Sequence, residues 1–453
     1  MKKIYLFTIA LLFTGNCAIQ AQVEKNDNKK ETEITVKDAQ GKQVTIDLPE
    51  AMTQELDSLM QLYNTKKYLK PDTNCNMPDV NPVYDKAVYM KRLSMLPTVI
   101  EMPYNDVVQT FIDRYSGHLR NSVSYMLGAQ NFYMPIFEEA LDTYGLPLEL
   151  KYLPVIESAL NPCAVSRVGA TGLWQFMIKT AKKYGLTINS LVDERRDPIK
   201  SSYAAAHYLS DLYKFYGDWN LVIAAYNCGT DKISKAMHRS KQTDYWKIYP
   251  YLPEETKGYV PAFIAANYIM NYYCDHNICP MTSELPEKTD TILVNKDITF
   301  EQISHVLGID IDQIRTLNPQ YRHDLVNGNW RPSSLRLPIL MITKFIDNED
   351  SIYAYKPVEV TTKRTEVEVN NEEPVVSKSR SYSRHKSSYS DSSKYTRKKK
   401  KNKRKHASKS VTIGDGDTLS EIAEKHNTTV SKLKKLNGIN GSSIRAGKKI
   451  KVK

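Results

Sequence analysis

Apolar residues recur every three or four positions through the middle of this chain, from about residue 96 to residue 285, and alternating stretches are rare there. This spacing predicts amphipathic helices. The clearest helices are expected at 107–115, 122–144, 147–160, 178–184, 198–216, 219–226 and 259–273. Tyrosine is common on the faces of these helices. The pattern therefore predicts an all-α domain over 96–285.

The pattern changes after a proline-containing break at 279–286. Residues 290–340 read as a strand, two short helices and a strand, which are expected at 291–294, 300–307, 311–317 and 335–338. Residues 409–453 repeat this order, with elements expected at 411–413, 416–426, 430–436 and 450–452. We therefore expect a multidomain chain in which two small β-α-α-β modules follow the helical domain.

Residues 1–21 have the composition of an export signal. Two lysines precede the mostly apolar residues 4–13, and this apolar core is shorter than the roughly 20 residues that span a bilayer. Cleavage is expected after Ala21. Lipid attachment at Cys17 is the weaker alternative, because residues 14–16 match the approach to a lipidated cysteine poorly. The expected location is the periplasm or cell envelope, with outer-membrane association left open and with no transmembrane helix.

Two further regions are polar. Residues 22–95 form an N-terminal region in which 22–50 are expected to be disordered or loosely attached and 51–68 show helical spacing. Residues 341–408 are expected to be a disordered basic linker. The formal net charge of +12 arises there, since 375–410 hold fourteen Lys or Arg and one acid. Export argues against a nucleic-acid partner, so the expected counter-charge is an anionic polymer or envelope surface.

Six cysteines are present, and removal of the signal would leave five, including Cys75, which cannot all pair within one chain. A domain of this size can be stable without disulfides, so we expect no disulfide framework. The pairing of Cys163, Cys228, Cys274 and Cys279 stays open. The paired Cys-x-x-Cys spacing of zinc sites is absent. We therefore expect no metal and no cofactor.

One acid stands in an otherwise apolar stretch. Glu157 follows Val155 and Ile156, and the Asn161-Pro162 pair must end its helix, which places the acid in or near the last turn. The negative end of the helix dipole and the apolar neighbours both disfavour ionisation, so the pKa of Glu157 is expected to be raised. A carboxylic acid that keeps its proton near neutral pH can act as a general acid.

Four motifs carry a resemblance to a known family. They are E-S at 157–158 with N-P at 161–162, G-x-x-G-L-W-Q-F-M at 169–177, A-A-Y-N-C-G at 224–229 and E-T-x-x-Y-V at 255–260. With these motifs the segment 147–273 resembles the soluble-lytic-transglycosylase (SLT) family, whose catalytic domain has a lysozyme-like α fold and cleaves peptidoglycan. Trp174 and the module downstream resemble the membrane-bound lytic murein transglycosylase D branch. The departure is Cys228, where the family usually has alanine.

The resemblance implies that the β-1,4 bond between MurNAc and GlcNAc is cleaved without water. Glu157 would protonate the leaving oxygen and then take the proton of the muramyl C6 hydroxyl, so that a 1,6-anhydro sugar forms. Asp193, Glu194 and Asp197 are better explained as ion pairs and helix caps than as a second catalytic acid, and Glu255 as structural. The resemblance assigns substrate contacts to Ser158, Ser166, Gly172, Trp174, Gln175, Met177, Tyr226, Asn227 and Tyr259.

Residues 409–453 resemble a LysM module, which binds glycans that contain N-acetylglucosamine. The match rests on G-D-T-L at 416–419, I-A at 422–423, V-x-x-L at 430–433, L-N at 436–437 and I-R-A-G at 444–447. It implies glycan contacts from Gly416, Asp417, Thr418, Leu419 and Asn437. A small core is expected from Leu419, Ile422, Leu433, Leu436 and Ile450. Residues 290–340 resemble the same module without its G-D-T start, so sugar binding and a spacer role are both open.

The leading hypothesis is a peptidoglycan lytic transglycosylase whose partners are the glycan strands of the wall. A lysozyme-like hydrolase, in which water attacks the sugar, is the alternative within the same chemistry. A non-catalytic wall-binding scaffold is the alternative from another class of protein. The apolar setting of Glu157 argues against the scaffold.

Overall fold

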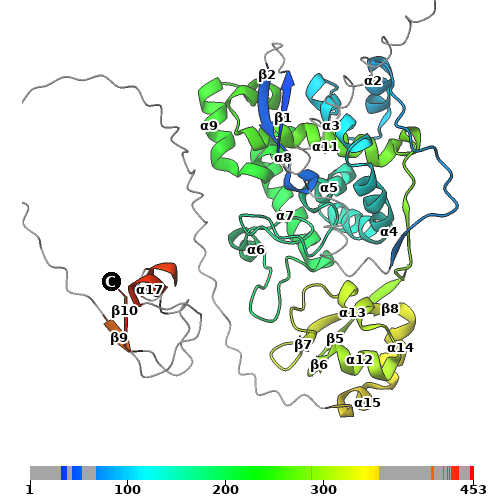
Figure 1. The fold of residues 1–453 in the computed structure, drawn as a ribbon, viewed down its shortest axis with the longest axis vertical. Coiled ribbons are helices and arrows are strands. Elements are labelled where there is room, and N and C mark those ends of the chain that lie inside the picture. The colour runs from blue at the N-terminus through cyan, green and yellow to red at the C-terminus, as the bar shows by residue number, and fades with distance from the viewer. Residues whose placement is uncertain are drawn as a thin grey trace, which may run out of the picture. The chain divides into compact units, whose positions relative to one another are not determined.

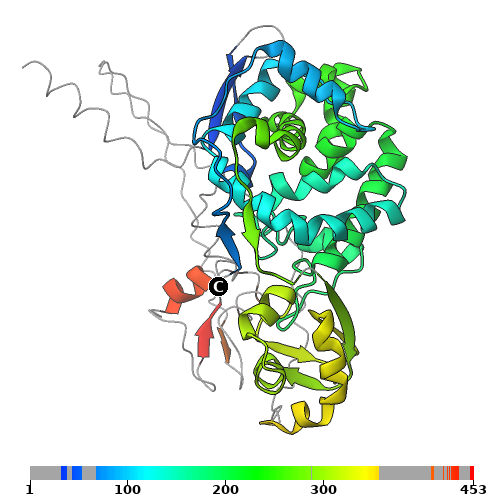
Figure 2. The same ribbon diagram turned by 90° about the vertical axis from the view of Figure 1, so that its right-hand side faces the viewer.

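The structure is a computed structural model that describes residues 32–37, 43–53, 68–286, 288–356, 410–412, 422, 426, 428, 430–437 and 449–452. It divides into two compact units, residues 1–376 and 377–453. In the first unit a helical domain is joined to a smaller α/β module, as Figures 1 and 2 show. Within the described ranges no helix is long and apolar enough to cross a membrane. The helix expected at 51–68 lies mostly outside the described residues, and its start belongs to the 3-10 turn η1 (Glu50–Thr53).

The N-terminal residues form a β-hairpin that packs on the helical domain. Strands β1 (Glu33–Lys37) and β2 (Gln43–Asp47) pair antiparallel, and Ile46 is completely buried in the main core. Helix α11 (Glu254–Tyr272) contributes Gly258 to this contact, where a Cβ atom would collide with the backbone of β2. The expectation that residues 22–50 are loosely attached is therefore wrong for this hairpin, because it buries one of its faces.

The helical domain is built around α11, whose residues 256–270 are all buried (Figure 1). It packs against α3, α5 and α8. The other helices are α2 (Lys86–Met95), α3 (Asp106–Ser116), α4 (Arg120–Thr143), η3 (Leu148–Tyr152), α5 (Leu153–Ser158), α6 (Ile178–Lys183), α7 (Pro198–Tyr216), α8 (Trp219–Cys228), α9 (Thr230–Ser240), α10 (Tyr245–Ile248), η4 (Tyr249–Tyr251) and η5 (Cys274–His276). The seven predicted helices are confirmed, with the one at 147–160 divided into η3 and α5. Helices α2, α9 and α10 were not predicted.

A disulfide joins Cys75 to Cys279, with 5.9 Å between their Cα atoms. Beside it, β3 (Leu69–Pro71) pairs antiparallel with β4 (Met281–Ser283). The expectation of no disulfide is therefore wrong. The two cysteines are 204 residues apart in the sequence, so only the completed fold brings them together. The bond fastens the segment that precedes α2 to the segment that follows α11.

The module after the helical domain contains every element that the sequence predicted for 290–340. Its elements are β5 (Thr289–Val294), β6 (Asp297–Thr299), α12 (Phe300–Leu307), α13 (Ile311–Leu317), β7 (Leu325–Asn327), β8 (Ser333–Pro338), α14 (Ile339–Asp347) and α15 (Glu349–Ala354). Strands β5 and β8 pair antiparallel, as do β6 and β7. Phe345 and Ile352, from the last two helices, are buried in the core of the module. The module therefore continues to residue 354, where the linker was expected to begin at 341.

The second unit has the same framework in its described residues. Strand β9 (Ser410–Thr412) pairs antiparallel with β10 (Lys449–Lys451), and α17 (Val430–Asn437) packs on β10. The predicted core is confirmed for Ile422, Leu433 and Ile450, whereas Leu436 is 42% exposed and does not belong to it. Residues 416–419, which carry most of the expected glycan contacts, lie outside the described residues.

One asparagine holds helix and strand together in each module. In the first, the Asn318 amide nitrogen donates to the carbonyl oxygens of Ile314 and Arg336, and its oxygen accepts from the Arg336 amide, each at 2.8 Å. In the second, Asn437 makes the same three bonds to Leu433 and Lys451, again at 2.8 Å. The described parts of the two modules therefore share this helix-to-strand connection. Asn437 has a structural role, and its glycan contact stays a prediction.

Candidate active site

Glu157 lies in the last turn of α5, as predicted. The helix has Pro154 in its first turn, where the missing N–H costs nothing. It ends at Ser158 because Ala159 and Leu160 both adopt left-handed backbone angles, with φ of 50° and 59°. The acid is therefore held at the end of a short helix, just before the chain reverses.

The surroundings of Glu157 keep its carboxyl protonated. The residue is half-buried, so its carboxyl stays reachable from solvent although packed protein atoms surround it closely. Burial raises the pKa to about 8, the hydroxyl of Tyr259 acts in the opposite direction by donating to Glu157 Oε1, and the negative charge of Glu255 raises it further. At neutral pH most molecules therefore carry a neutral acid at this position.

Two tyrosines flank the acid. Tyr259 of α11 is 1% exposed, and burial together with the nearby Glu157 raises its pKa well above the ordinary value. Tyr226 of α8 is half-buried, and its hydroxyl donates to the carbonyl oxygen of Trp174 at 2.7 Å. Burial and the field of Glu157 also raise the pKa of Tyr226. Both phenols are therefore neutral hydrogen-bond donors next to the carboxyl.

Residues 164–176 form a compact structure that we call the glycine turn. Thr171 forms β-bridges with both Val165 and Phe176, and the Gly172 amide donates to the carbonyl oxygen of Ala164 at 2.9 Å. Gly172 has a φ of +91°, and a Cβ atom there would collide with the Arg195 carbonyl group. A glycine is therefore required at this position both for its backbone angle and for packing.

The polar side chains of the glycine turn are used largely within it. Gln175, with a φ of 47°, donates from Nε2 to the carbonyl oxygen of Gly172 at 2.7 Å. Ser166 accepts from the Ala170 amide at 2.9 Å. Both side chains are half-buried, as is Met177 at the start of α6. All three side chains are partly accessible to solvent, and their substrate contacts stay predictions.

Two of the predicted substrate contacts are buried. Ser158 has no exposed surface, and its hydroxyl donates to the carbonyl oxygen of Leu173 at 2.9 Å. Trp174 is 1% exposed, and its Nε1 donates to Ser202 Oγ at 2.9 Å. Neither side chain offers a surface to a ligand. Both instead hold the glycine turn against α5 and α7, which corrects the expectation that they touch the sugar.

Asn227 and Cys228 end α8 near the same region. Asn227 is half-buried and its Oδ1 accepts from the Thr256 hydroxyl at 2.9 Å. Burial raises the pKa of Cys228, so its thiol stays protonated at neutral pH. Cysteine at this position therefore behaves as a small neutral residue.

The acids at 193–197 have structural roles, as the sequence indicated. Asp193 pairs with Arg195 and Glu194 with Lys200, while Asp197 caps α7 by accepting from two backbone amides. Sequence reasoning missed the influence of Glu255, which is exposed at the start of α11 and whose charge acts on Glu157. Over the residues that the structure describes, no three metal-ligating side chains gather.

Three family models match this chain. The transglycosylase SLT domain matches residues 134–249, the LysM-like domain of lytic transglycosylase MltD matches 288–354, and the LysM domain matches 411–453. These matches coincide with the helical core around Glu157 and with the two β-α-α-β modules.

Several proteins are similar to this chain over part of its length. Membrane-bound lytic murein transglycosylase D of Escherichia coli K12 is 33% identical over 179 residues, which are 38% of this chain and 39% of that protein. Invasion protein IagB of Salmonella typhi is 31% identical over 141 residues, which are 29% of this chain and 86% of that protein. The chain thus spans well under half of the first relative. A solved structure, the 70 kDa soluble lytic transglycosylase of Escherichia coli, is 23% identical, covers 37% of this chain and 31% of its own, and has a TM-score of 0.29.

Proposed function

Because this chain belongs to the lytic murein transglycosylase family with an SLT domain and LysM modules, we propose that it cleaves peptidoglycan glycan strands and leaves 1,6-anhydro-MurNAc ends. The observation that carries the proposal is a single acid, Glu157, whose pKa is about 8 and whose carboxyl accepts a hydrogen bond from Tyr259. A group with a pKa near the working pH can donate a proton and later accept one.

The reaction follows from the two protonation states of Glu157. The neutral carboxyl donates its proton to the glycosidic oxygen, and the bond between that oxygen and C1 of MurNAc breaks. The carboxylate that remains is disfavoured by burial, so it readily takes the proton of the C6 hydroxyl. The C6 oxygen bonds to C1, the 1,6-anhydro ring closes and Glu157 regains its proton. No water molecule is consumed in this reaction.

The tyrosines support the charged stage of this reaction. The hydroxyl of Tyr259 already donates to Glu157 Oε1, so it stabilises the carboxylate that exists between the two proton transfers. Tyr226 is aligned by its bond to the Trp174 carbonyl. In this proposal its phenol supplies a dipole to the developing positive charge of the sugar ring. Asn227 is assigned the muramyl N-acetyl group on the basis of its motif position.

The hydrolytic alternative would use Glu255 as its second carboxylate. An inverting hydrolase needs a second carboxylate that activates water, and the charge of Glu255 acts on Glu157. Glu255 is exposed at the start of α11, where water can reach its carboxyl group. If water attacked the sugar, Glu255 would be the base that activates it.

The remaining parts of the chain serve the same substrate in this proposal. The module at 411–453 binds glycan strands and keeps Glu157 close to its polymer, which raises the effective concentration of the substrate. The similarity to a membrane-bound transglycosylase supports a location in the cell envelope. The basic segment 375–410 would meet anionic groups of that envelope.

Digestion of purified sacculi by the wild type and by Glu157→Gln tests the proposal. We expect wild-type products with anhydro ends, and turnover lowered by about 10²- to 10⁴-fold in the variant, the usual contribution of a general acid. Glu255→Gln is the matched control and should keep most of the activity. Products about 18 Da heavier, with free reducing ends and lost in Glu255→Gln, would establish the hydrolase instead. Binding of sacculi without turnover by the wild type would favour a scaffold.

A further inference from the structure

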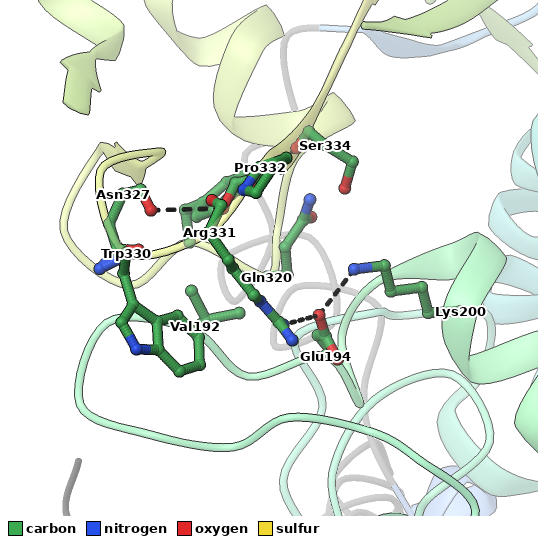
Figure 3. A pocket seen from close by; sticks show the side chains of 11 residues that line it. Val192, Glu194, Lys200, Gln320, Asn327, Trp330, Arg331, Pro332 and Ser334 are labelled. Atoms are coloured by element: carbon green, nitrogen blue, oxygen red, sulfur yellow. Dashed lines mark hydrogen bonds and ion pairs between the residues drawn. The ribbon is translucent and has the colours of Figure 1, made fainter. Parts of the chain in front are cut away.

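The first module is attached to the helical domain directly beside the glycine turn. A backbone bridge joins Val192 to Tyr321, and the amide of Arg322 donates to the carbonyl oxygen of Leu191 at 2.9 Å. The contact lies between the chain segment 187–194 of the helical domain and the loops that precede β7 and β8, as Figure 3 shows from close by. The two parts thus share a continuous hydrogen-bonded backbone contact.

Two arginines of the module reach two neighbouring acids of the helical domain. Arg322 Nη2 lies 2.8 Å from Asp193 Oδ2, and Arg331 Nη2 lies 2.8 Å from Glu194 Oε1. The second pair is drawn in Figure 3 with Lys200, which binds the same carboxylate oxygen at 2.6 Å. The two arginine side chains are similarly accessible, with 35% and 40% of their surfaces exposed.

Of these two ion pairs, the one between Arg322 and Asp193 is linked to the glycine turn by further hydrogen bonds. Asp193 is 1% exposed and accepts from Arg195 Nε at 2.9 Å and from Arg195 Nη2 at 2.8 Å. The remaining nitrogen, Arg195 Nη1, donates to the carbonyl oxygens of Gly169 at 3.0 Å and Phe176 at 3.1 Å. Arg195 thereby connects Gly169 to Phe176, the last residue of the glycine turn. Its own carbonyl group packs against Gly172.

We propose that the first module positions the glycine turn through the chain of contacts from Arg322 to Asp193 to Arg195. Arg322 is then a positioning residue for the site of Glu157, although it lies in a different module. That the turn borders the reacting sugar rests on the proposed function above. The module has a mechanical role in this proposal, which is separate from any binding of glycan.

The electrostatics of Asp193 explain why Arg322 matters. Burial alone would raise the pKa of this carboxyl, but hydrogen bonds and charge from Arg195, then the charges of Arg322 and Arg196, outweigh it and hold the pKa below its usual value. Asp193 is therefore a buried anion that both guanidinium groups stabilise. Removal of Arg322 leaves one carboxylate oxygen without its outer partner, and the buried pair that holds the turn loses its fixed geometry.

Arg331 provides a matched control at the same interface. Its partner Glu194 also binds Lys200 and accepts from the Thr187 amide at 2.6 Å. Lys200 and Thr187 lie along segment 187–200. Among the residues that the structure describes, no hydrogen bond of the Glu194 carboxylate leads to the glycine turn. Loss of Arg331 therefore weakens the attachment of the module without altering the contacts of Arg195.

The test compares Arg322→Ala with Arg331→Ala in the full chain. Hydrogen exchange is measured over residues 164–176, where the amides of Gly172 and Phe176 are bonded within the turn. Turnover at saturating glycan is measured in parallel. We expect Arg322→Ala to exchange faster in this segment and to turn over about tenfold more slowly, while Arg331→Ala matches the wild type in both measurements. Both variants should keep the melting temperature of the helical domain within a few degrees of each other.

Two results would overturn the proposal. Equal exchange over 164–176 in the two variants would show that the ion pair of Arg322 does not hold the turn. Faster exchange with unchanged turnover would show that the turn is held but that its geometry does not matter to the reaction. If the wild type itself has no lytic activity, the proposed function fails, and the exchange comparison still decides whether Arg322 controls the turn.

Discussion

Replacing Glu157 with glutamine should stabilise this protein above neutral pH, even though it removes the proposed catalytic acid. In the wild type the folded state holds a proton on Glu157 up to a pH of about 8, whereas the unfolded chain releases it near 4.5. Between these values the folded state binds one proton more than the unfolded state. Stability therefore falls as the pH rises from about 4.5 to about 8. Glutamine cannot ionise, so the stability of the variant does not fall for this reason.

The size of this change in the free energy of unfolding follows from the pKa shift of Glu157. One pKa unit corresponds to about 1.36 kcal/mol, so the full shift from 4.5 to about 8 sets an upper limit of about 5 kcal/mol. The residue is half-buried and its carboxylate would keep part of its hydration. We therefore expect a difference of about 2 to 3 kcal/mol at pH 9 relative to pH 4. The Tyr259 hydroxyl can donate to the amide oxygen of glutamine, so that hydrogen bond does not confound the comparison.

Urea unfolding of both proteins at half-unit steps from pH 4 to pH 9, with the disulfide intact, measures this difference. The free energy of unfolding of Glu157→Gln minus that of the wild type should be flat at low pH, rise through neutral pH and level off above about pH 8. Turnover by the wild type should fall as the pH rises past about 8, because Glu157 then loses its proton. Parallel stability curves across the whole range would mean that Glu157 titrates normally and would refute the single-acid argument.

Three further predictions concern other parts of the helical domain. Tyr259→Phe removes the hydrogen bond that favours the carboxylate, so the alkaline limit of activity should move above about pH 8 while turnover at neutral pH falls about tenfold, as a pH–rate profile would reveal. Gly172→Ala should lower the free energy of unfolding by more than about 2 kcal/mol, whereas Gly185→Ala, also at positive φ but with open space around it, should cost only about 1 kcal/mol. Cys75→Ser should cost about 2 to 5 kcal/mol in urea unfolding, and reduction of the wild type should reproduce that loss.

The helices that the sequence predicts best are those with chemical signals at both ends. Helix α7 begins where Asp197 caps two amides and ends at Gly217, which adopts a φ of 63°. The last turn of α5 was predicted because Asn161-Pro162 cannot continue a helix. In contrast, α9 buries only Ile233 and Ala236, so its apolar pattern is too sparse to read from sequence alone.

Tertiary features escaped prediction because sequence spacing carries no information about them. The two halves of the Cys75–Cys279 bond are separated by nearly the whole helical domain. Trp174 belongs to a recognisable motif, yet only the packing of α7 shows that its ring turns inward to Ser202. A motif indicates which residues build a site. It does not distinguish those that face the ligand from those that support the backbone.

The two modules differ in the residues that follow their shared asparagine. In both modules the asparagine bonded to a strand lies at the C-terminal end of a helix, α13 in the first and α17 in the second. In the first module the five residues from this asparagine onward read Asn-Pro-Gln-Tyr-Arg and include Arg322, which docks on Asp193. In the second module the five corresponding residues read Asn-Gly-Ile-Asn-Gly, and none of these five is a cation.

The second module therefore lacks the group that attaches the first one, and it keeps the G-D-T-L start that is absent from the first. In the first module the residues that are hydrogen-bonded to the helical domain are occupied by that contact. In the proposal above, the first module is attached through Arg322 together with the ion pair of Asp193 with Arg195.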